Sequence, residues 1–393
     1  MELSLLALFL TAGLASLFMS WVIGAGSSGA TPFAPAVGAN AVSTMRAALV
    51  VGVFGFLGAV VQGGNVSEAV GRGLVGGVTL PAAGVITVLL IGAGLMAVGI
   101  RTGYPIATAF TVTGAVVGVG LALGGTPAWG KYQQVGAVWV LTPFVGGGLA
   151  YAIASVLPRE DAPERVCIPL LAGMVGAVLA NVGFAGLGPD GTPGSVAGAT
   201  RRLLAPESQL LPLAVTSGVT LAVVGLVYWD VSRDETGGLR RVLLALGSLV
   251  AFSAGGSQVG LAVGPLLPLL DDVGVITPAV VLAGGGVGIL VGSWTGAPRM
   301  IKALAQDYSS LGPRRSIAAL VPSFLIAQTA VVLGVPVSFN EIVVSAIIGS
   351  GAAVGGSDAV SARKLSVTVG AWAGSFGLAF GLGYAAVTLS PML

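Results

Sequence analysis

The sequence predicts an all-α polytopic membrane protein with two inverted repeats, broken or re-entrant helices and about 10–12 membrane segments. The first observation is composition: 55% of the 393 residues are hydrophobic and only 8% are charged, whereas soluble proteins carry about 25% charged residues. The second is a series of apolar stretches long enough to span a bilayer. The third is a glycine- and proline-containing segment that occurs once in each half. We therefore expect a multi-pass protein of the cell membrane.

Apolar stretches of about 18–25 residues qualify as transmembrane helices. They lie at about 3–23, 44–63, 78–100, 133–157, 166–187, 209–229, 239–254, 274–296, 316–334 and 364–389. Shorter apolar segments rich in Gly, Pro, Ser and Thr lie at about 24–40, 104–122, 255–270 and 336–355. We interpret these four as half-helices or re-entrant hairpins. Ordinary glycine-rich spans are the alternative, because Gly and Pro are common in membrane helices.

The duplicated segment reads GYPIATAFTVTGAVVGVG at 103–120 and GVPVSFNEIVVSAIIGSG at 334–351, so the copies are 231 positions apart (334 − 103) without a gap. The same spacing relates GAGSSGA, which begins at Gly24, to GGSQVGL, which begins at Gly255. Duplicated Gly/Pro-interrupted segments in an apolar chain indicate a transporter with its site between two repeats.

This spacing divides the chain into three parts. We predict a first transmembrane repeat at 1–157, a connecting section with two extra spans at 158–231, and a second transmembrane repeat at 232–393. The connecting section is the part in which we least expect the site.

Basic residues indicate the orientation. The densest basic stretch, APRMIKALAQDYSSLGPRRS at 297–316, is predicted to be cytoplasmic. Its counterpart at about 66–85 carries Arg72 as its only basic residue, balanced by Glu68. A loop on the inside with its counterpart on the outside predicts repeats of inverted topology.

Several function classes are disfavoured by what the chain lacks. It has no histidine and a single cysteine, Cys167, which removes histidine metal ligands, a Ser-His pair and an internal disulfide. A net charge of +2 spread over loops does not indicate the basic surface of a nucleic-acid-binding protein. We expect neither an enzyme nor a nucleic-acid-binding protein, and no cofactor apart from a bound Na⁺ or a transported H⁺.

Polar residues of the four short segments are the candidate substrate ligands. Each segment places Ser, Thr, Asn or Gln directly after glycines or a proline, where a half-helix would begin. Free N–H groups and the positive end of the helix dipole would then face the same point as the hydroxyls. Several such helix ends together would bind an anion without any Lys or Arg. For each residue taken alone, the alternative role is helix packing or a hydrogen bond to its own backbone. The candidates are Ser27, Ser28, Thr31, Thr108, Ser257, Gln258, Ser338 and Asn340.

Glu341 is the candidate ion-coupling residue, together with Gln258. It is an ionisable residue inside an apolar stretch, and desolvation favours its neutral form, which suits a proton or cation carrier. A solvated position at a water-filled mouth is the alternative. Its counterpart at the 231 spacing is Phe110 (341 − 231), so only one repeat would perform this role.

At these residues the chain resembles the inorganic phosphate transporter (PiT) family over nearly its full length. The family's G-x-P-x-S-T-T-H hairpin is matched by Gly103-Tyr-Pro105 and by Gly334-Val-Pro336-Val-Ser338. Where the family has Asn-Asp, this chain has Gly26-Ser27 and Ser257-Gln258, and Phe110 and Glu341 replace the hairpin histidine. The serine-bearing first motif is also similar to a sulfate-transporting branch of the same family.

The resemblance implies a secondary active transporter of phosphate, coupled to H⁺ or Na⁺. A sulfate or related oxyanion permease of the same fold and a passive anion channel are the alternatives. An intramembrane enzyme and a purely structural subunit fit the polar half-helices poorly. The expected partners are the oxyanion and the lipid bilayer, with a homodimer as the candidate assembly.

Overall fold

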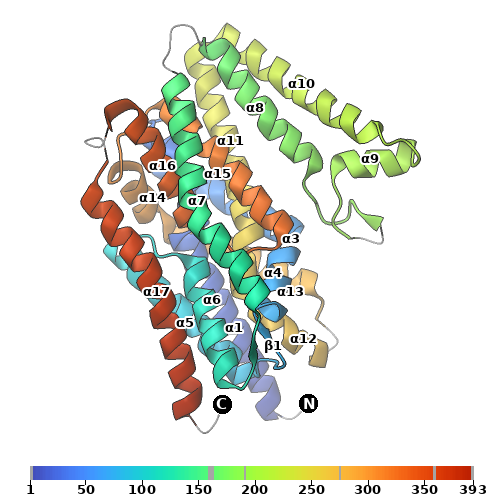
Figure 1. Cartoon of the computed structure of the whole chain (residues 1–393), viewed down its shortest axis with the longest axis vertical. Helices are drawn as coiled ribbons and strands as arrows, with labels where there is room; N and C mark the ends of the chain where they lie inside the picture. The colour runs from blue at the N-terminus through green and yellow to red at the C-terminus, as the bar shows by residue number, and fades with distance from the viewer. Residues whose placement is uncertain (1–2, 158–162, 190–191, 274–275, 357–359, 391–393) are drawn as a thin grey trace.

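The computed structural model describes residues 3–157, 163–189, 192–273, 276–356 and 360–390. It is an elongated bundle of helices (Figure 1). In this part of the chain, ten helices are long and apolar enough to cross a membrane, and each lies over one of the predicted spans. The protein is therefore an integral membrane protein, as its composition predicts.

Two sets of helices flank a middle section. The first set comprises α1 (Leu3–Gly26), α2 (Ala34–Gly38), α3 (Thr44–Gln62), α4 (Gly64–Arg72), α5 (Ala82–Thr102), α6 (Thr108–Ala122) and α7 (Trp129–Val156). Two short strands, β1 (Val75–Gly76) and β2 (Thr126–Pro127), pair in antiparallel orientation. The middle section holds α8 (Glu164–Asn181), α9 (Val196–Leu204) and α10 (Leu211–Arg233).

The second set begins with α11 (Glu235–Val263), the 3₁₀ turn η2 (Gly264–Leu266) and α12 (Leu267–Val273). It continues with α13 (Pro278–Thr295), α14 (Ala297–Gln306), α15 (Pro313–Leu333), α16 (Phe339–Gly355) and α17 (Ala362–Leu389). The basic stretch at 297–316 is thus partly helical, since it contains α14.

Corresponding helices of the two sets run in opposite directions. In Figure 1, α1 and α7 run upward from the end that holds the N-terminus, whereas α11 and α17 run downward. The two repeats are therefore inverted in topology, as the basic residues predict.

The helices of one repeat pack chiefly on those of the other. Helix α6 lies along α17 and α16 lies along α7, while α1 packs on α13 and α3 on α11. Glycine permits the close approach: a Cβ atom on Gly118 would overlap the carbonyl of Phe380, and one on Gly349 would overlap the carbonyl of Gly147. Small residues serve the same purpose in other membrane helix pairs. Neither repeat could form this bundle without the other.

Two short helices, α6 and α16, begin inside the bundle after a break in the chain. Helices α5 and α15 end at Gly103 and Gly334, which adopt left-handed φ angles of 72° and 58°. Glycine reaches this region without strain, and the prolines two residues later, Pro105 and Pro336, cannot continue a helix. Each break therefore ends one helix and aims the start of the next into the bundle.

The prediction of a half-helix at 255–270 is wrong. Helix α11 runs without interruption from Glu235 to Val263. Its glycines provide close packing instead of a break, because a Cβ atom on Gly255 would overlap the backbone of Gly55 on α3. The predicted segment at 24–40 does not begin with a half-helix either, since α1 continues to Gly26, a turn follows, and the short helix α2 begins only at Ala34.

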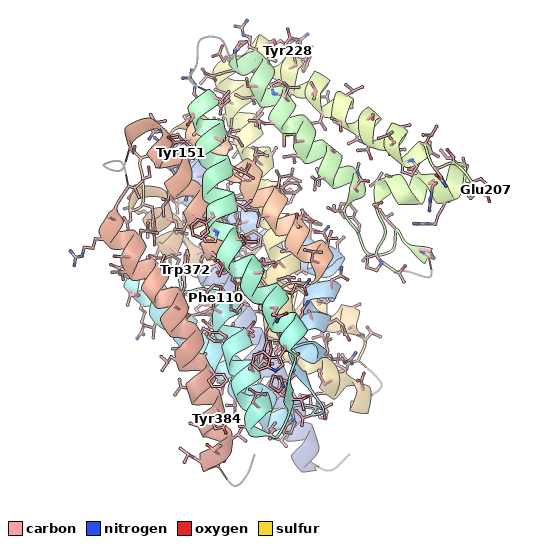
Figure 2. The ribbon with its side chains drawn as sticks, viewed as in Figure 1. Phe110, Tyr151, Glu207, Tyr228, Trp372 and Tyr384 are labelled. Atoms are coloured by element: carbon pink, nitrogen blue, oxygen red, sulfur yellow. The ribbon has the colours of Figure 1, made fainter. Side chains whose placement is uncertain are left out.

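The middle section lies to one side of the bundle. In Figure 1, α8, α9 and α10 extend away from the two short helices, and α10 packs mainly on α8. Figure 2 places Glu207 at the far tip of this section, while Phe110 and Trp372 lie near the middle of the bundle.

Candidate functional site

Hydrogen bonds join the first, second and fourth predicted segments. Ser27, directly after α1, donates from Oγ to Gln258 Oε1 at 3.1 Å. These two residues are related by the 231 spacing (258 − 27). Gln258 on α11 in turn donates from Nε2 to the carbonyl of Val337, at 2.6 Å. The end of α1 and the last turns of α11 are therefore tied to the loop that leads into α16.

Asn340 joins the third segment to the same cluster. Its Nδ2 donates to the carbonyl of Ile106, just before α6, at 2.6 Å and to the carbonyl of Gly26 at 3.3 Å. Ile106 and Val337 are also related by the 231 spacing (337 − 106). An amide side chain thus holds each of the two loops, and all four predicted segments meet at one place.

The starts of α6 and α16 supply backbone donors to this place. The first amides bonded back into these helices are Thr111 and Ile342, each to the carbonyl four residues earlier at 3.1 Å. The amides of 108–110 and 339–341 precede them and stand outside the helical ladder. Two helix N-termini with their positive dipole ends make an anion-binding arrangement.

Several buried polar atoms of the cluster have no partner in the protein. Buried polar atoms are nearly always hydrogen-bonded, so a group of uncommitted ones indicates a place for a ligand or water. Hydroxyls and backbone amides would donate to an anion, and the amide and carboxyl oxygens would accept from a protonated one. The unpartnered atoms are Thr108 Oγ1, Ser257 Oγ, Ser338 Oγ, Asn340 Oδ1 and Glu341 Oε2, on side chains exposed by 0–2%.

A capping role does not account for Ser338 and Glu341. They stand at the N-cap and third position of α16, the spacing at which a Ser and a Glu can cap a helix reciprocally. Yet Ser338 makes no side-chain cap bond, and Ser338 Oγ and Glu341 Oε2 are both unpartnered. Their polar atoms are available to something other than the helix end.

The structure corrects the expected geometry at the end of α1. The amide of Ser27 bonds to the carbonyl of Ile23 at 2.9 Å, so Ser27 follows the C-terminal end of a helix. Ser28 and Thr31 are also committed, because their hydroxyls donate to the carbonyls of Ile23 and Ser27, at 3.5 and 3.1 Å. A helix C-terminus carries partial negative charge and favours a cation. Thr108, Ser338 and Asn340 are therefore the predicted residues that do lie at helix starts.

Ser257 and Gln258 lie inside α11 and not at its beginning. Their backbone amides belong to the helix, so these residues can offer only side-chain atoms. Gln258 uses its amide group to hold Ser27 and Val337, whereas the Ser257 hydroxyl is free.

The cluster is closed to both ends of the bundle. All eight predicted substrate ligands are fully buried, and Glu341 is 2% exposed. Figure 2 shows Phe110 and Trp372 at mid-height, between Tyr151 near one end and Tyr384 near the other. The candidate ligands are thus buried near the middle of the bundle.

Two tryptophans that the sequence did not single out hold the hairpin loops. Trp139 on α7 donates to the carbonyl of Pro336, and Trp372 on α17 donates to that of Pro105, both at 2.8 Å. Trp139 also stacks on Phe110 at 3.9 Å between ring centroids. The signal that could have found them is a spacing of 233 (372 − 139) in place of 231.

A second buried polar group lies beside α11. Gln328 Nε2 donates to Gln62 Oε1 at 3.1 Å and to Ser253 Oγ at 2.8 Å. Gln62 Nε2 donates to the carbonyl of Gly183 at 2.9 Å. The group fixes α3, α11 and α15 to one another next to the candidate site.

Known proteins resemble this chain over most of its length. The sequence profile described as the phosphate transporter family matches residues 23–383. A putative phosphate permease of Thermococcus kodakarensis is 26% identical over 368 residues, 86% of each chain. A chloroplastic inorganic phosphate transporter of Arabidopsis thaliana is 25% identical over 90% of this chain and 67% of its own. A solved structure described as the sodium-dependent phosphate transporter superposes with a TM-score of 0.79 over 98% of both chains, at 23% identity, and so supports the fold.

Candidate ligand residues with unpartnered hydroxyls and scaffold residues should differ in how much their substitution changes the free energy of unfolding, because only the scaffold side chains form hydrogen bonds within the protein. Ser338→Ala should leave the stability of the anion-free protein unchanged or raise it by up to about 1–3 kcal/mol, because its buried hydroxyl has no partner. Gln258→Leu should lower it by about 1–3 kcal/mol, since it leaves the Val337 carbonyl unpaired. Thermal unfolding in detergent without phosphate measures both. Equal losses would contradict the distinction.

Proposed function

The chain belongs to the phosphate transporter family, and we propose that it is a secondary active transporter of inorganic phosphate across the cytoplasmic membrane. The observation that carries the proposal is the group of unpartnered buried polar atoms at the starts of α6 and α16. Further support comes from the relatives, whose names describe phosphate permeases and transporters. No catalytic step is part of this function.

We propose that the anion lies between the two helix starts. Thr108 and Ser338 would donate hydroxyl bonds, and the free amides at 108–110 and 339–341 would donate backbone bonds. None of these donors carries a full charge. Neutral dipoles can hold a dehydrated oxyanion and still release it, whereas a buried unpaired Arg would be costly and would bind tightly.

The acceptor atoms favour phosphate over sulfate. Hydrogen phosphate carries a P–OH group that can donate a hydrogen bond, and sulfate at neutral pH has no such proton. Asn340 Oδ1 and Glu341 Oε2 are both unpartnered acceptors. An ionised Glu341 would repel either anion, but only hydrogen phosphate could offset this by donating a hydrogen bond to it, whereas a protonated Glu341 could donate to sulfate. The sulfate permease is therefore the second candidate.

Two routes of coupling are compatible with the site. Glu341 would carry a proton, because no partner in the described structure satisfies its Oε2 atom. Alternatively, Na⁺ would bind near the C-terminal end of α1, where Ser27 and Gln258 supply side-chain oxygens. The name of the solved relative, a sodium-dependent phosphate transporter, favours testing Na⁺ directly.

The occluded site favours a carrier over a channel. A channel needs a continuous path, whereas the candidate ligands are closed from both ends. In the proposed cycle, the units 1–157 and 232–393 rock against each other around the site, and 158–231 connects them. The site then opens to one end of the bundle at a time.

Uptake of radiolabelled phosphate into proteoliposomes tests the proposed function. We expect saturable uptake that increases with an inward H⁺ or Na⁺ gradient, with unlabelled phosphate competing at least about tenfold better than sulfate. Empty liposomes are the control. Preferred uptake of sulfate would replace phosphate as the substrate, gradient-independent flux would indicate a channel, and no uptake of either anion would exclude the function.

Glu341→Gln tests the role of the carboxyl group. The variant keeps the size of the side chain but cannot bind or release a proton, so an inward H⁺ gradient should no longer stimulate uptake. Loss of a charged acceptor is worth about 1.5–3 kcal/mol, so phosphate should lose about tenfold or more of its advantage over sulfate. Competition uptake at fixed pH measures this ratio, with exposed Glu207→Gln as the matched control. An unchanged ratio and an unchanged response to pH would contradict both roles.

A further inference from the structure

Two lysines hold the hairpin loops from opposite ends of the bundle. Lys131 Nζ donates to the carbonyl of Gly334 at 3.0 Å, and Lys364 Nζ donates to that of Gly103 at 3.4 Å. Each lysine is the third residue of a long helix, α7 or α17. Because α7 and α17 run in opposite directions (Figure 1), the two ammonium groups lie on opposite sides of the site.

The charge on Lys364 is compensated. Its Nζ lies 3.0 Å from Asp307 Oδ2, and the side chain is 16% exposed. The same ammonium group lies 4.2 Å from the ring centroid of Tyr104. An ion pair covered by an aromatic ring has little charge left to attract an anion.

The charge on Lys131 is not compensated in the same way. Its further partner is the neutral Gln134, whose Oε1 lies 3.1 Å from Nζ. Among the described residues, no Asp or Glu forms a salt bridge with Lys131. The two hairpin loops are held alike, but only one of the two lysines keeps an unpaired positive charge.

A cavity that is wide open to the surface of the protein adjoins this free charge. It has a volume of about 560 Å³, and its lining includes Asn65, Glu68, Arg72, Lys131 and Gly334. Arg72 is balanced within the protein, because it pairs with Glu68 at 3.0 Å and with Asp271 at 2.7 Å. Lys131 is therefore the cation of this cavity that remains available.

One short loop connects the lining of the cavity to the candidate site. Gly334 contacts Lys131, and Ser338 at the start of α16 is four residues further on (338 − 334). A chain of that length reaches at most about 14 Å. An anion held at Lys131 would need to move only about that distance to meet the free donors of α16.

We propose that this cavity is the outer vestibule of the transport path and that Lys131 is its anion-collecting residue. A tetrahedral oxyanion arriving from this end contacts the ammonium group, which exchanges its bond to the Gly334 carbonyl for a bond to the anion. The exchange releases the loop before α16 at the moment of arrival. The inference deepens the proposed function and rests on it.

The two ends of the proposed transport path differ in charge. Asp307, the partner of Lys364, lies within the basic stretch at 297–316, which the distribution of charges predicts to be cytoplasmic. Under the same prediction, Lys131 lies at the opposite, external end. The asymmetry of charge therefore favours capture of the anion from outside the cell at low concentration, because a focused positive potential raises its local concentration there. The gradients of the anion and of the coupling ion still set the direction of net transport.

Lys131→Gln, Lys131→Met and Lys131→Arg, assayed by phosphate uptake in proteoliposomes, test the vestibule. We expect both neutral variants to raise the KM for external phosphate about tenfold, with a maximal rate within about twofold of the unmodified protein. Lys131→Arg should keep a low KM. The unmodified protein and Lys131→Arg should show a KM that rises with external ionic strength, and this dependence should weaken in the neutral variants. Lys302→Gln, at an exposed position on α14, is the control and should match the unmodified protein.

An unchanged KM in the neutral variants would overturn the proposal, as would an equal loss of maximal rate in all three variants, which would mark Lys131 as a structural tether alone. If the neutral variants do not fold, the test is the KM of the unmodified protein for external phosphate, measured at several external salt concentrations. A KM that does not change with external salt would overturn the vestibule proposal. Failure of the proposed function gives a different result, because the unmodified protein would then take up no phosphate.

Discussion

The structure depends on providing hydrogen-bond partners for backbone groups in the middle of a membrane protein, where the helices are interrupted. In hydrocarbon, each unpaired carbonyl or amide costs several kcal/mol, so irregular chain is tolerated only where protein or a polar cavity covers it. Here the two loops before α6 and α16 bring such carbonyls to mid-depth. Side chains from the opposite repeat cover them: Trp139 holds Pro336 and Trp372 holds Pro105. The amides at the helix starts stay free, and these are the groups that an anion can use.

The same constraint explains why the scaffold is symmetric and the site is not. Backbone coverage requires matched elements in both repeats, and the glycines, prolines, lysines and tryptophans occur in pairs. The chemistry requires no such match. Phe110 fills space against Trp139, while its counterpart Glu341 offers a free carboxyl oxygen. One repeat thus contributes packing where the other contributes an acceptor, and we propose that this difference selects the anion and couples its movement.

The breaks at Gly103 and Gly334 could be predicted from sequence, because a glycine and a proline two residues apart act locally. The positions of Thr108 and Ser338 follow directly from them. The role of Gly255 could not be predicted, because glycine serves a chain break and a close helix contact equally well, and only the presence of Gly55 opposite distinguishes the two. The tryptophans were missed for another reason. Helix α17 starts 23 residues after α16 (362 − 339) and α7 starts 21 after α6 (129 − 108), so a comparison at a fixed spacing of 231 does not align them.

The central claim, that an oxyanion binds between the starts of α6 and α16, is tested most directly by diffraction from crystals grown with arsenate. Arsenate is tetrahedral like phosphate, and its arsenic atom gives an anomalous signal that marks the anion without reference to its ligands. We expect an anomalous peak within hydrogen-bond reach of the amides and hydroxyls of Thr108 and Ser338. A site without arsenic there, with peaks confined to surface residues such as Arg314 and Arg315, would contradict it.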